Sequence, residues 1–221
     1  MHTNLSLRIL QEIAQLIPEG SHVLDLGCAE GDLLDYLSRT KHVKGMGVDI
    51  DEAMVLRCIS RGISVFQGDL DEGLKDYQTA SYDYVILSRT LQVIHKPVLL
   101  LKEMVRVGKH AIVSFPNFGY APIRLQLLFR GQMPVTPSLP YQWFNTPNIH
   151  LCTKKDFRNL CEELRISILQ EIDLWNGKRI PSFTGNLCST EVCFLLQGMA
   201  SSDSKETPAQ VESMVSKSSL S

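Results

Sequence analysis

The chain has 221 residues, 44% of them hydrophobic and 21% charged, with a formal net charge of −2. This composition predicts one ordinary globular domain without the basic face that nucleic-acid binding requires. The sequence also lacks a signal-peptide pattern and any run of roughly 18 apolar residues, and its six cysteines show no metal-ligand spacing, so we expect a cytoplasmic protein with no membrane partner and no metal.

Short apolar runs alternate with amphipathic stretches from the N-terminus onward. Residues 5–17 have apolar side chains at helical spacing, and a turn at 18–21 precedes a first strand at 22–26. Further strands are predicted at 43–50, 63–68, 82–87, 109–115, 166–174 and 191–196, and further helices at 32–39, 51–60, 97–107 and 157–164. Strands that alternate with helices in this way predict an α/β fold with a parallel sheet covered on both faces.

The segment 116–153 interrupts this alternation. It holds six prolines, interleaved with aromatic residues and arginines, and Thr153 then offers a cap for the next helix. We expect a loop-rich insertion with a functional role inside a single domain of residues 1–200. Residues 201–221 are Ser-rich with almost no large apolar side chains, which predicts a disordered tail.

A glycine turn, Gly27-Cys28-Ala29-Glu30-Gly31, follows the first predicted strand. Gly27 lets the chain turn sharply, and Gly31 permits a ligand to approach the backbone where the helix begins. The acidic Asp25 and Glu30 would repel the pyrophosphate of a dinucleotide but suit the ammonium of S-adenosylmethionine, so the charge favours S-adenosylmethionine over NAD. The structural alternative is that these glycines only punctuate a loop.

Acidic residues also end the next two strands. Asp49 follows the glycine turn by about 20 residues and can accept hydrogen bonds from both ribose hydroxyls, whereas the alternative role of helix cap suits Asp51 better. Asp69 lies where this fold class binds the adenine amine, although it could instead bond its own backbone in a turn. The residues predicted to bind S-adenosylmethionine are Asp25, Gly27, Cys28, Ala29, Gly31, Asp49, Ile50, Asp69, Leu70 and Ser88.

Longer stretches resemble the MetW family of methionine-biosynthesis proteins. They are 68–74, 82–88, 111–119 and, most specifically, Pro140-Tyr141-Gln142-Trp143-Phe144-Asn145-Thr146-Pro147-Asn148-Ile149-His150-Leu151-Cys152-Thr153. The resemblance covers roughly residues 4 to 198. It implies a Rossmann-like class I methyltransferase fold, with a doubly wound, mostly parallel seven-stranded sheet and helices on both faces. Ala29 departs from the family, which carries glycine there, and alanine is costly at that position if its φ is positive.

The resemblance implies a role in methionine biosynthesis, as an activating or regulatory subunit of the homoserine O-acyltransferase MetX with S-adenosylmethionine as ligand. The alternative is a methyltransferase that acts on a small carboxylic acid or a carrier-bound acyl group and releases S-adenosylhomocysteine. Candidate catalytic residues lie in the insertion: His150 as a base, Tyr141 as an acceptor wall and Arg124 as a carboxylate clamp. Each has a structural alternative, namely a backbone hydrogen bond, packing onto the sheet or a solvated charge. Whether the protein is an enzyme stays open at this point.

Overall fold

The computed structural model describes residues 4–198, with side chains from Arg8 onward, so the predicted tail lies outside the described residues. Its strands are β1 (His22–Leu26), β2 (Lys44–Asp49), β3 (Val65–Gln67), β4 (Tyr82–Ser88), β5 (Gly108–Pro116), β6 (Ile166–Trp175), β7 (Lys178–Ile180) and β8 (Glu191–Gly198). Its helices are α1 (Asn4–Leu16), α2 (Asp32–Lys41), α3 (Glu52–Ser60), α4 (Pro97–Val107), α5 (Ala121–Arg130), α6 (Lys154–Glu163) and α7 (Gly185–Cys188), with 3-10 turns η1 (Leu70–Glu72), η2 (Leu91–Val93) and η3 (Ser182–Thr184).

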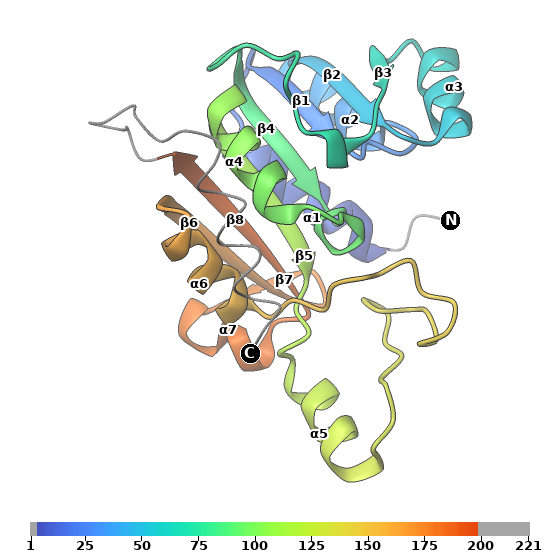
Figure 1. The fold of residues 1–221 in the computed structure, drawn as a ribbon, viewed down its shortest axis with the longest axis vertical. Helices are drawn as coiled ribbons and strands as arrows, with labels where there is room; N and C mark the ends of the chain where they lie inside the picture. The colour runs from blue at the N-terminus through green and yellow to red at the C-terminus, as the bar shows by residue number, and fades with distance from the viewer. Residues whose placement is uncertain (1–3, 199–221) are drawn as a thin grey trace.

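All eight strands form one sheet in the order β3-β2-β1-β4-β5-β8-β6-β7 (Figure 1). Strands β1 to β5 are parallel to one another, and β8 runs antiparallel between β5 and β6. The chain builds outward from β1 to β3 and then returns to place β4 on the other side of β1. Such a reversal of strand order is where open α/β sheets bind ligands, beyond the carboxyl ends of the strands.

The mostly parallel α/β sheet is as predicted, but the count of seven strands was wrong. The eighth, β7, pairs antiparallel with β6 at the edge of the sheet. Its charged Lys178 and Arg179 interrupt the apolar pattern by which strands are recognised in a sequence. Charged side chains of this kind are common on edge strands. The signal that predicts it is Asn176-Gly177, whose φ values of 48° and 78° give the tight turn of a two-residue hairpin.

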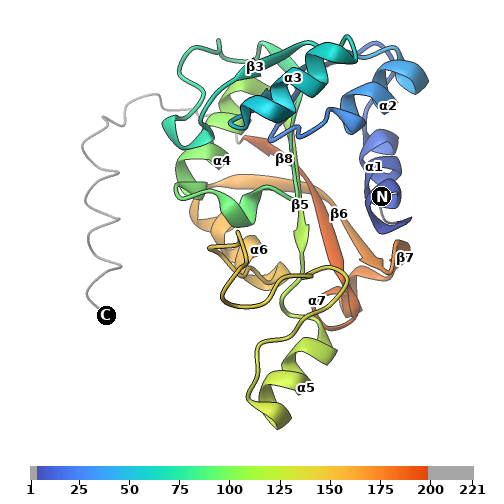
Figure 2. The ribbon, with the colours of Figure 1, turned by 90° about the vertical axis from the view of Figure 1, so that its right-hand side faces the viewer.

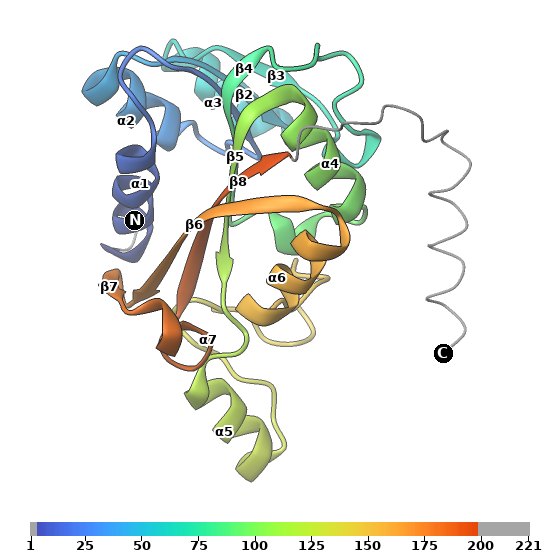
Figure 3. The same ribbon diagram turned by 90° about the vertical axis from the view of Figure 1, so that its left-hand side faces the viewer.

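Two hydrophobic cores lie on opposite faces of the sheet, because successive side chains of a strand point to opposite sides. In β4, Val85 and Leu87 belong to the core beneath α4 and α6, whereas Tyr84 and Ile86 belong to the core beneath α1, α2 and α3. Figures 2 and 3 view the sheet from its sides and show these helices in separate layers. No helix within residues 4–198 has the length and apolar character needed to cross a membrane.

Residues 117–153, hereafter the arm, extend away from the sheet between β5 and α6 (Figures 1–3). Much of the arm lacks regular structure, but it also contains the ten-residue helix α5. Pro122 lies in the first turn of α5, where its missing N–H costs nothing, and Gly131 ends the helix at a φ of 61°. The arm is therefore better described as a helix and a returning loop than as a loop alone.

Candidate ligand-binding site

The glycine turn after β1 is held against β2 by its own backbone. The amides of Gly27 and Cys28 both donate to the carbonyl of Val48, over 2.8 and 3.1 Å. Gly27 has a φ of +70°, and a Cβ there would lie 2.6 Å from the side chain of Thr90. Gly27 is therefore needed for its backbone conformation and for the close approach of the segment after β4.

Gly31 lets the start of α2 pack closely against its neighbours. Its φ is +78°, and a Cβ would lie 2.5 Å from Ile63 and 3.1 Å from the thiol of Cys58. These contacts belong to the core that includes residues of α2 and α3. Gly31 thus allows α2 to begin close to its neighbours, and it lines neither of the two cavities described below.

Ala29 has a φ of 48°, in the left-handed region that residues other than glycine, asparagine and aspartate seldom adopt. Its amide donates to the Oδ2 of Asp49 over 2.7 Å, and this bond fixes the turn. Alanine in this conformation therefore carries a steric cost that glycine would not.

Asp49 connects the turn to the following loop. Besides accepting from Ala29, it accepts the amide of Asp51 through Oδ1 over 3.0 Å. The cap of α3 is Asp51, which accepts the amide of Ala53 over 2.8 Å. The capping role is thus filled by Asp51, and Asp49 is left at the end of β2 beside the turn.

Asp25 is the other carboxylate of this region, and only 3% of the residue is exposed. Among the described residues, none donates a hydrogen bond to its side chain. Burial first, and then the nearby negative charge of Asp49, raise the pKa of Asp25 to about 7. An acid held in this way favours a cation or a proton beside it.

Two cavities meet at Gly27. One, of about 380 Å³, is lined by Gly27, Asp49, Ile50, Asp69, Leu70, Asp71, Thr90, Val93, Ile94 and His95. The other, of about 390 Å³, is lined by Ile9, Leu10, Asp25, Gly27, Cys28, Ala29, Glu30, Asp32, Leu33, Met54, Ser88 and Arg89. Together they bring together nine of the ten residues predicted to bind S-adenosylmethionine, all except Gly31.

Asp69 forms the turn that was its structural alternative, and it also lines a cavity. Its side chain accepts the amide of Asp71 over 2.8 Å and begins η1, which is the turn anticipated as the structural alternative. The residue nevertheless lines the first cavity. The turn and the cavity are therefore compatible, since a carboxylate has further lone pairs to offer.

Sequence reasoning missed the residues after β4 that line the first cavity, namely Thr90, Val93, Ile94 and His95. Thr90 closely follows the end of β4, so the strand-end rule that selected Asp49 would have selected it, whereas the other three belong to or follow η2. Arg89 lines the second cavity, with a φ of 57° and its Nε 3.3 Å from the buried carboxylate of Glu191. The lining residues of α1 had no local signal, because that helix reaches the site only through long-range packing.

The three candidate catalytic residues lie on the arm and line neither cavity. Arg124 donates from Nε to the carbonyl of Gly119 over 2.6 Å. The backbone amide of His150 donates to the carbonyl of Gln92 over 3.0 Å, and Tyr141 is 49% exposed. Within residues 4–198, no three His, Cys, Asp or Glu side chains are grouped closely enough to hold a metal ion.

Comparison with solved structures identifies the fold. The chain superposes on S-adenosylmethionine-dependent methyltransferases from Thermotoga maritima (TM-score 0.62, 19% identity, 87% of this chain and 88% of that one) and Mesorhizobium loti (TM-score 0.63, 16% identity, 87% and 97%). It also superposes on the [4+2]-cyclase SpnF (TM-score 0.63, 13% identity, 88% and 82%). The fold is that of class I methyltransferases, and the cyclase shows that this fold hosts other chemistry as well.

Sequence comparison narrows the class to one family. Residues 8–196 match the family of the methionine biosynthesis protein MetW, so the chain belongs to it. A bifunctional methionine biosynthesis protein MetXA/MetW of Rhodopirellula baltica is 39% identical over 190 residues, which are 80% of this chain. The chain spans 30% of the length of that relative.

Proposed function

We propose that the two cavities together bind S-adenosylmethionine. The observation that carries this proposal is Asp25, a buried carboxylate that faces a cavity and receives no hydrogen bond from any described residue. Leaving such a group unpaired is costly, and the α-ammonium of S-adenosylmethionine would pair with it. Asp49 and Asp69, in the adjoining cavity, would accept hydrogen bonds from the ribose hydroxyls and the adenine amine.

The rest of the lining fits the same ligand. Arg89 is the cation among the lining residues of the second cavity and can attract the ligand's carboxylate. Ile50, Leu70 and Ile94 supply apolar contacts for the adenine ring in the first cavity. When bound, the ligand supplies an activated methyl sulfonium. The protein's residues would bind and orient it and exclude water.

We propose further that the protein acts in methionine biosynthesis as the activating or regulatory partner of a homoserine O-acyltransferase of the MetX type. The Rhodopirellula relative supports this, because it joins MetXA and MetW in one polypeptide. The arm candidates for methyl transfer lie away from both cavities, which favours a regulatory role over catalysis. A cytoplasmic location stays a prediction.

A hydrogen-bonded contact offers a route by which the ligand could affect the arm. The carbonyl of Gln92 accepts the amides of Ile149 and His150 in the returning limb of the arm, over 2.9 and 3.0 Å. Gln92 belongs to η2, whose next residue, Val93, lines the first cavity. Regulation requires the ligand to favour one arrangement of this contact over another, since equal affinity for both would shift nothing.

The test is the rate of homoserine acyl transfer by the acyltransferase of the same organism, measured with and without this protein. We expect clear stimulation at protein concentrations that saturate association, and a change in that stimulation when S-adenosylmethionine is added. Asp49→Ala should raise the S-adenosylmethionine concentration needed for that change while leaving the stimulation without ligand in place. An acyltransferase that is fully active alone and unaffected by the protein would contradict the proposal and would direct attention to methyl acceptors.

A further inference from the structure

The arm carries an unusual concentration of exposed apolar side chains. Ten of the nineteen exposed large hydrophobic side chains within the described residues lie on it: Leu125, Leu128, Phe129, Met133, Val135, Tyr141, Trp143, Phe144, Ile149 and Leu151. Leu125, Leu128 and Phe129 stand at positions i, i+3 and i+4 of α5 and therefore share one helical face. That face is turned to solvent, with Leu128 73% and Phe129 78% exposed.

The returning limb adds an aromatic pair to the same arm. Trp143 and Phe144 pack edge to face with ring centroids 5.7 Å apart, and both are at least 70% exposed. The ten side chains extend over α5 and the returning limb, and exposed apolar surface of this kind marks interaction sites on soluble proteins. Exposed aromatic residues of this kind are typical centres of binding energy in protein interfaces.

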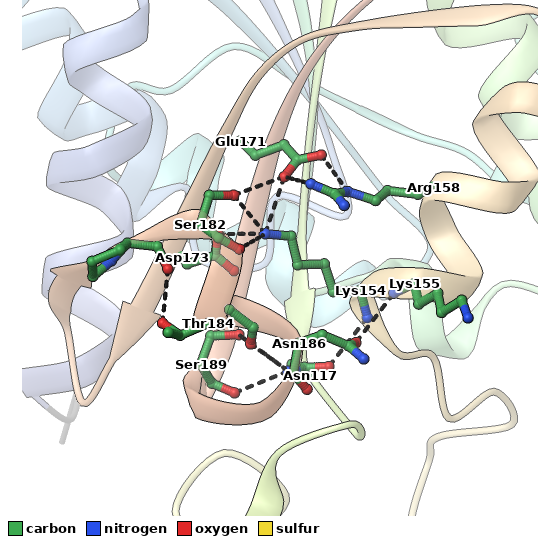
Figure 4. Close-up of polar contacts among 12 residues, drawn as sticks. Asn117, Lys154, Lys155, Arg158, Glu171, Asp173, Ser182, Thr184, Asn186 and Ser189 are labelled. Carbon is green, nitrogen blue, oxygen red and sulfur yellow. Dashed lines mark hydrogen bonds and ion pairs between the residues drawn. The ribbon is translucent and has the colours of Figure 1, made fainter.

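The arm is anchored firmly where it leaves and rejoins the sheet (Figure 4). Asn117, 1% exposed, accepts the amides of Gly119 and Lys154 through Oδ1, over 3.0 and 3.1 Å, and so ties the first residues of the arm to the start of α6. Its Nδ2 donates to the carbonyls of Gly185 and Ser189, over 3.2 and 3.1 Å. A surface held at both ends loses less conformational entropy when a partner binds than a free loop would.

The charge of the arm differs from that of the whole chain. Residues 117–153 contain Arg124 and Arg130 and no Asp or Glu, whereas the full chain has a net charge of −2. The arm therefore combines exposed apolar side chains with two cationic ones and no acidic ones. It fits a partner surface that is apolar and carries acidic residues.

We infer that the arm is the docking surface for the homoserine acyltransferase. The inference rests on the proposed function for the choice of partner. The fused Rhodopirellula relative favours that occupant over a second copy of this chain, because it keeps the acyltransferase and the MetW part in one molecule. The relative holds the two parts together by a covalent link, and the arm offers a non-covalent surface of apolar and cationic side chains for the same association.

The experiment measures binding of the full chain to the immobilised acyltransferase of the same organism. The variant Leu128→Ser with Phe129→Ser alters α5, and Trp143→Ser alters the returning limb. Both change only exposed side chains, so the fold should persist, and calorimetry with S-adenosylmethionine verifies that binding at the cavities is retained. Ile59→Ser is the matched control, since Ile59 is 58% exposed on α3 at the opposite end of the molecule (Figure 1).

We expect each arm variant to raise the Kd about 30-fold or more, as for interface hot spots, and Ile59→Ser to leave it unchanged. If the wild-type chain binds and the arm variants bind equally well, the docking inference is wrong while the proposed function stands. If the wild-type chain does not bind or stimulate the acyltransferase, both fail. Light scattering of the chain alone identifies a second copy as the occupant if the wild type is a dimer and the arm variants are monomers, which would also overturn the inference.

Discussion

Two buried polar clusters in this molecule differ in whether their buried charges are paired with opposite charges. At the foot of the arm, Lys154 is 2% exposed, and its Nζ lies 2.5 Å from Asp173, 2.8 Å from the hydroxyl of Ser182 and 3.0 Å from Glu171 (Figure 4). At the end of β1, Asp25 lies near Asp49 and receives no hydrogen bond from any described residue. The first cluster pairs opposite charges, whereas the second consists of two carboxylates.

The pKa values follow this difference. Burial alone would raise the pKa of Glu171, but hydrogen bonds from Arg158, Lys154 and Ser182 lower it to about 2. Burial and Asp49 instead raise the pKa of Asp25 to about 7. A buried charge with partners serves as scaffold, whereas a buried charge without them, at the mouth of a cavity, is the feature expected of a ligand site.

The largest expected effect comes from breaking the paired cluster. Lys154→Met should lower the free energy of unfolding by about 3–5 kcal/mol, because it leaves Asp173 buried without its cation. Urea unfolding followed by circular dichroism measures the loss, and Lys155→Met, at the exposed neighbouring position, is the control. Equal stability of the two variants would show that the cluster is not needed to hold the arm and α6 together.

Asp25, in contrast to Glu171, should make the protein less stable as the pH rises. Because the pKa of Asp25 is raised in the folded state, the unfolded chain binds fewer protons, and this group makes stability fall as pH rises from about 4 to above 7. Between pH 5 and pH 8 the loss is about 2–3 kcal/mol. Asp25→Asn should remove that part of the pH dependence in ligand-free protein. An unchanged pH profile of the melting temperature would place the Asp25 carboxylate in a wetter environment than described.

Substitutions of Asp49 and of the nearby Asp51 should differ in their effect on ligand affinity. Asp49→Ala should weaken S-adenosylmethionine binding by about 1–3 kcal/mol, since it removes a hydrogen-bond acceptor from the cavity and releases the amide of Ala29. Asp51→Ala should cost about 1 kcal/mol of stability through loss of the α3 cap and leave affinity unchanged. Calorimetric titration with S-adenosylmethionine measures the affinity of both variants. If the two variants bind the ligand equally well, Asp49 is not part of the binding site.

The smallest expected change in stability comes from a substitution in the glycine turn after β1. Ala29→Gly should raise the free energy of unfolding by about 1 kcal/mol, because glycine adopts the observed positive φ without steric cost. Ala80→Gly is the matched case, since Ala80 also has a positive φ of 54° but lies outside both cavities. Both variants should be stabilised, and only Ala29→Gly should alter ligand affinity. Destabilisation by Ala29→Gly alone would mean that the alanine methyl makes a favourable contact in the turn.

The two clusters also differ in how far the sequence could predict them. Asp25, Asp49 and Asp69 lie at strand ends, and in a parallel sheet those ends meet at one edge, so local patterns were enough to group them. Lys154 and Lys155 look alike in sequence, yet one is buried and the other exposed, because the partners of Lys154 lie on β6 and η3. The projection of α5 likewise depends on the anchoring of Asn117 to residues 185–189, which no local pattern encodes.

Calorimetric titration of S-adenosylmethionine into the wild-type protein and Asp25→Asn, at pH 7 in two buffers of different ionisation enthalpy, tests the central claim most directly. If the ligand's ammonium completes the unpaired cluster, binding lowers the pKa of Asp25 and the wild type releases about half a proton. Asp25→Asn should bind more weakly and release correspondingly less. Equal affinity and equal proton release in the two proteins would contradict the assignment of Asp25 to the ligand.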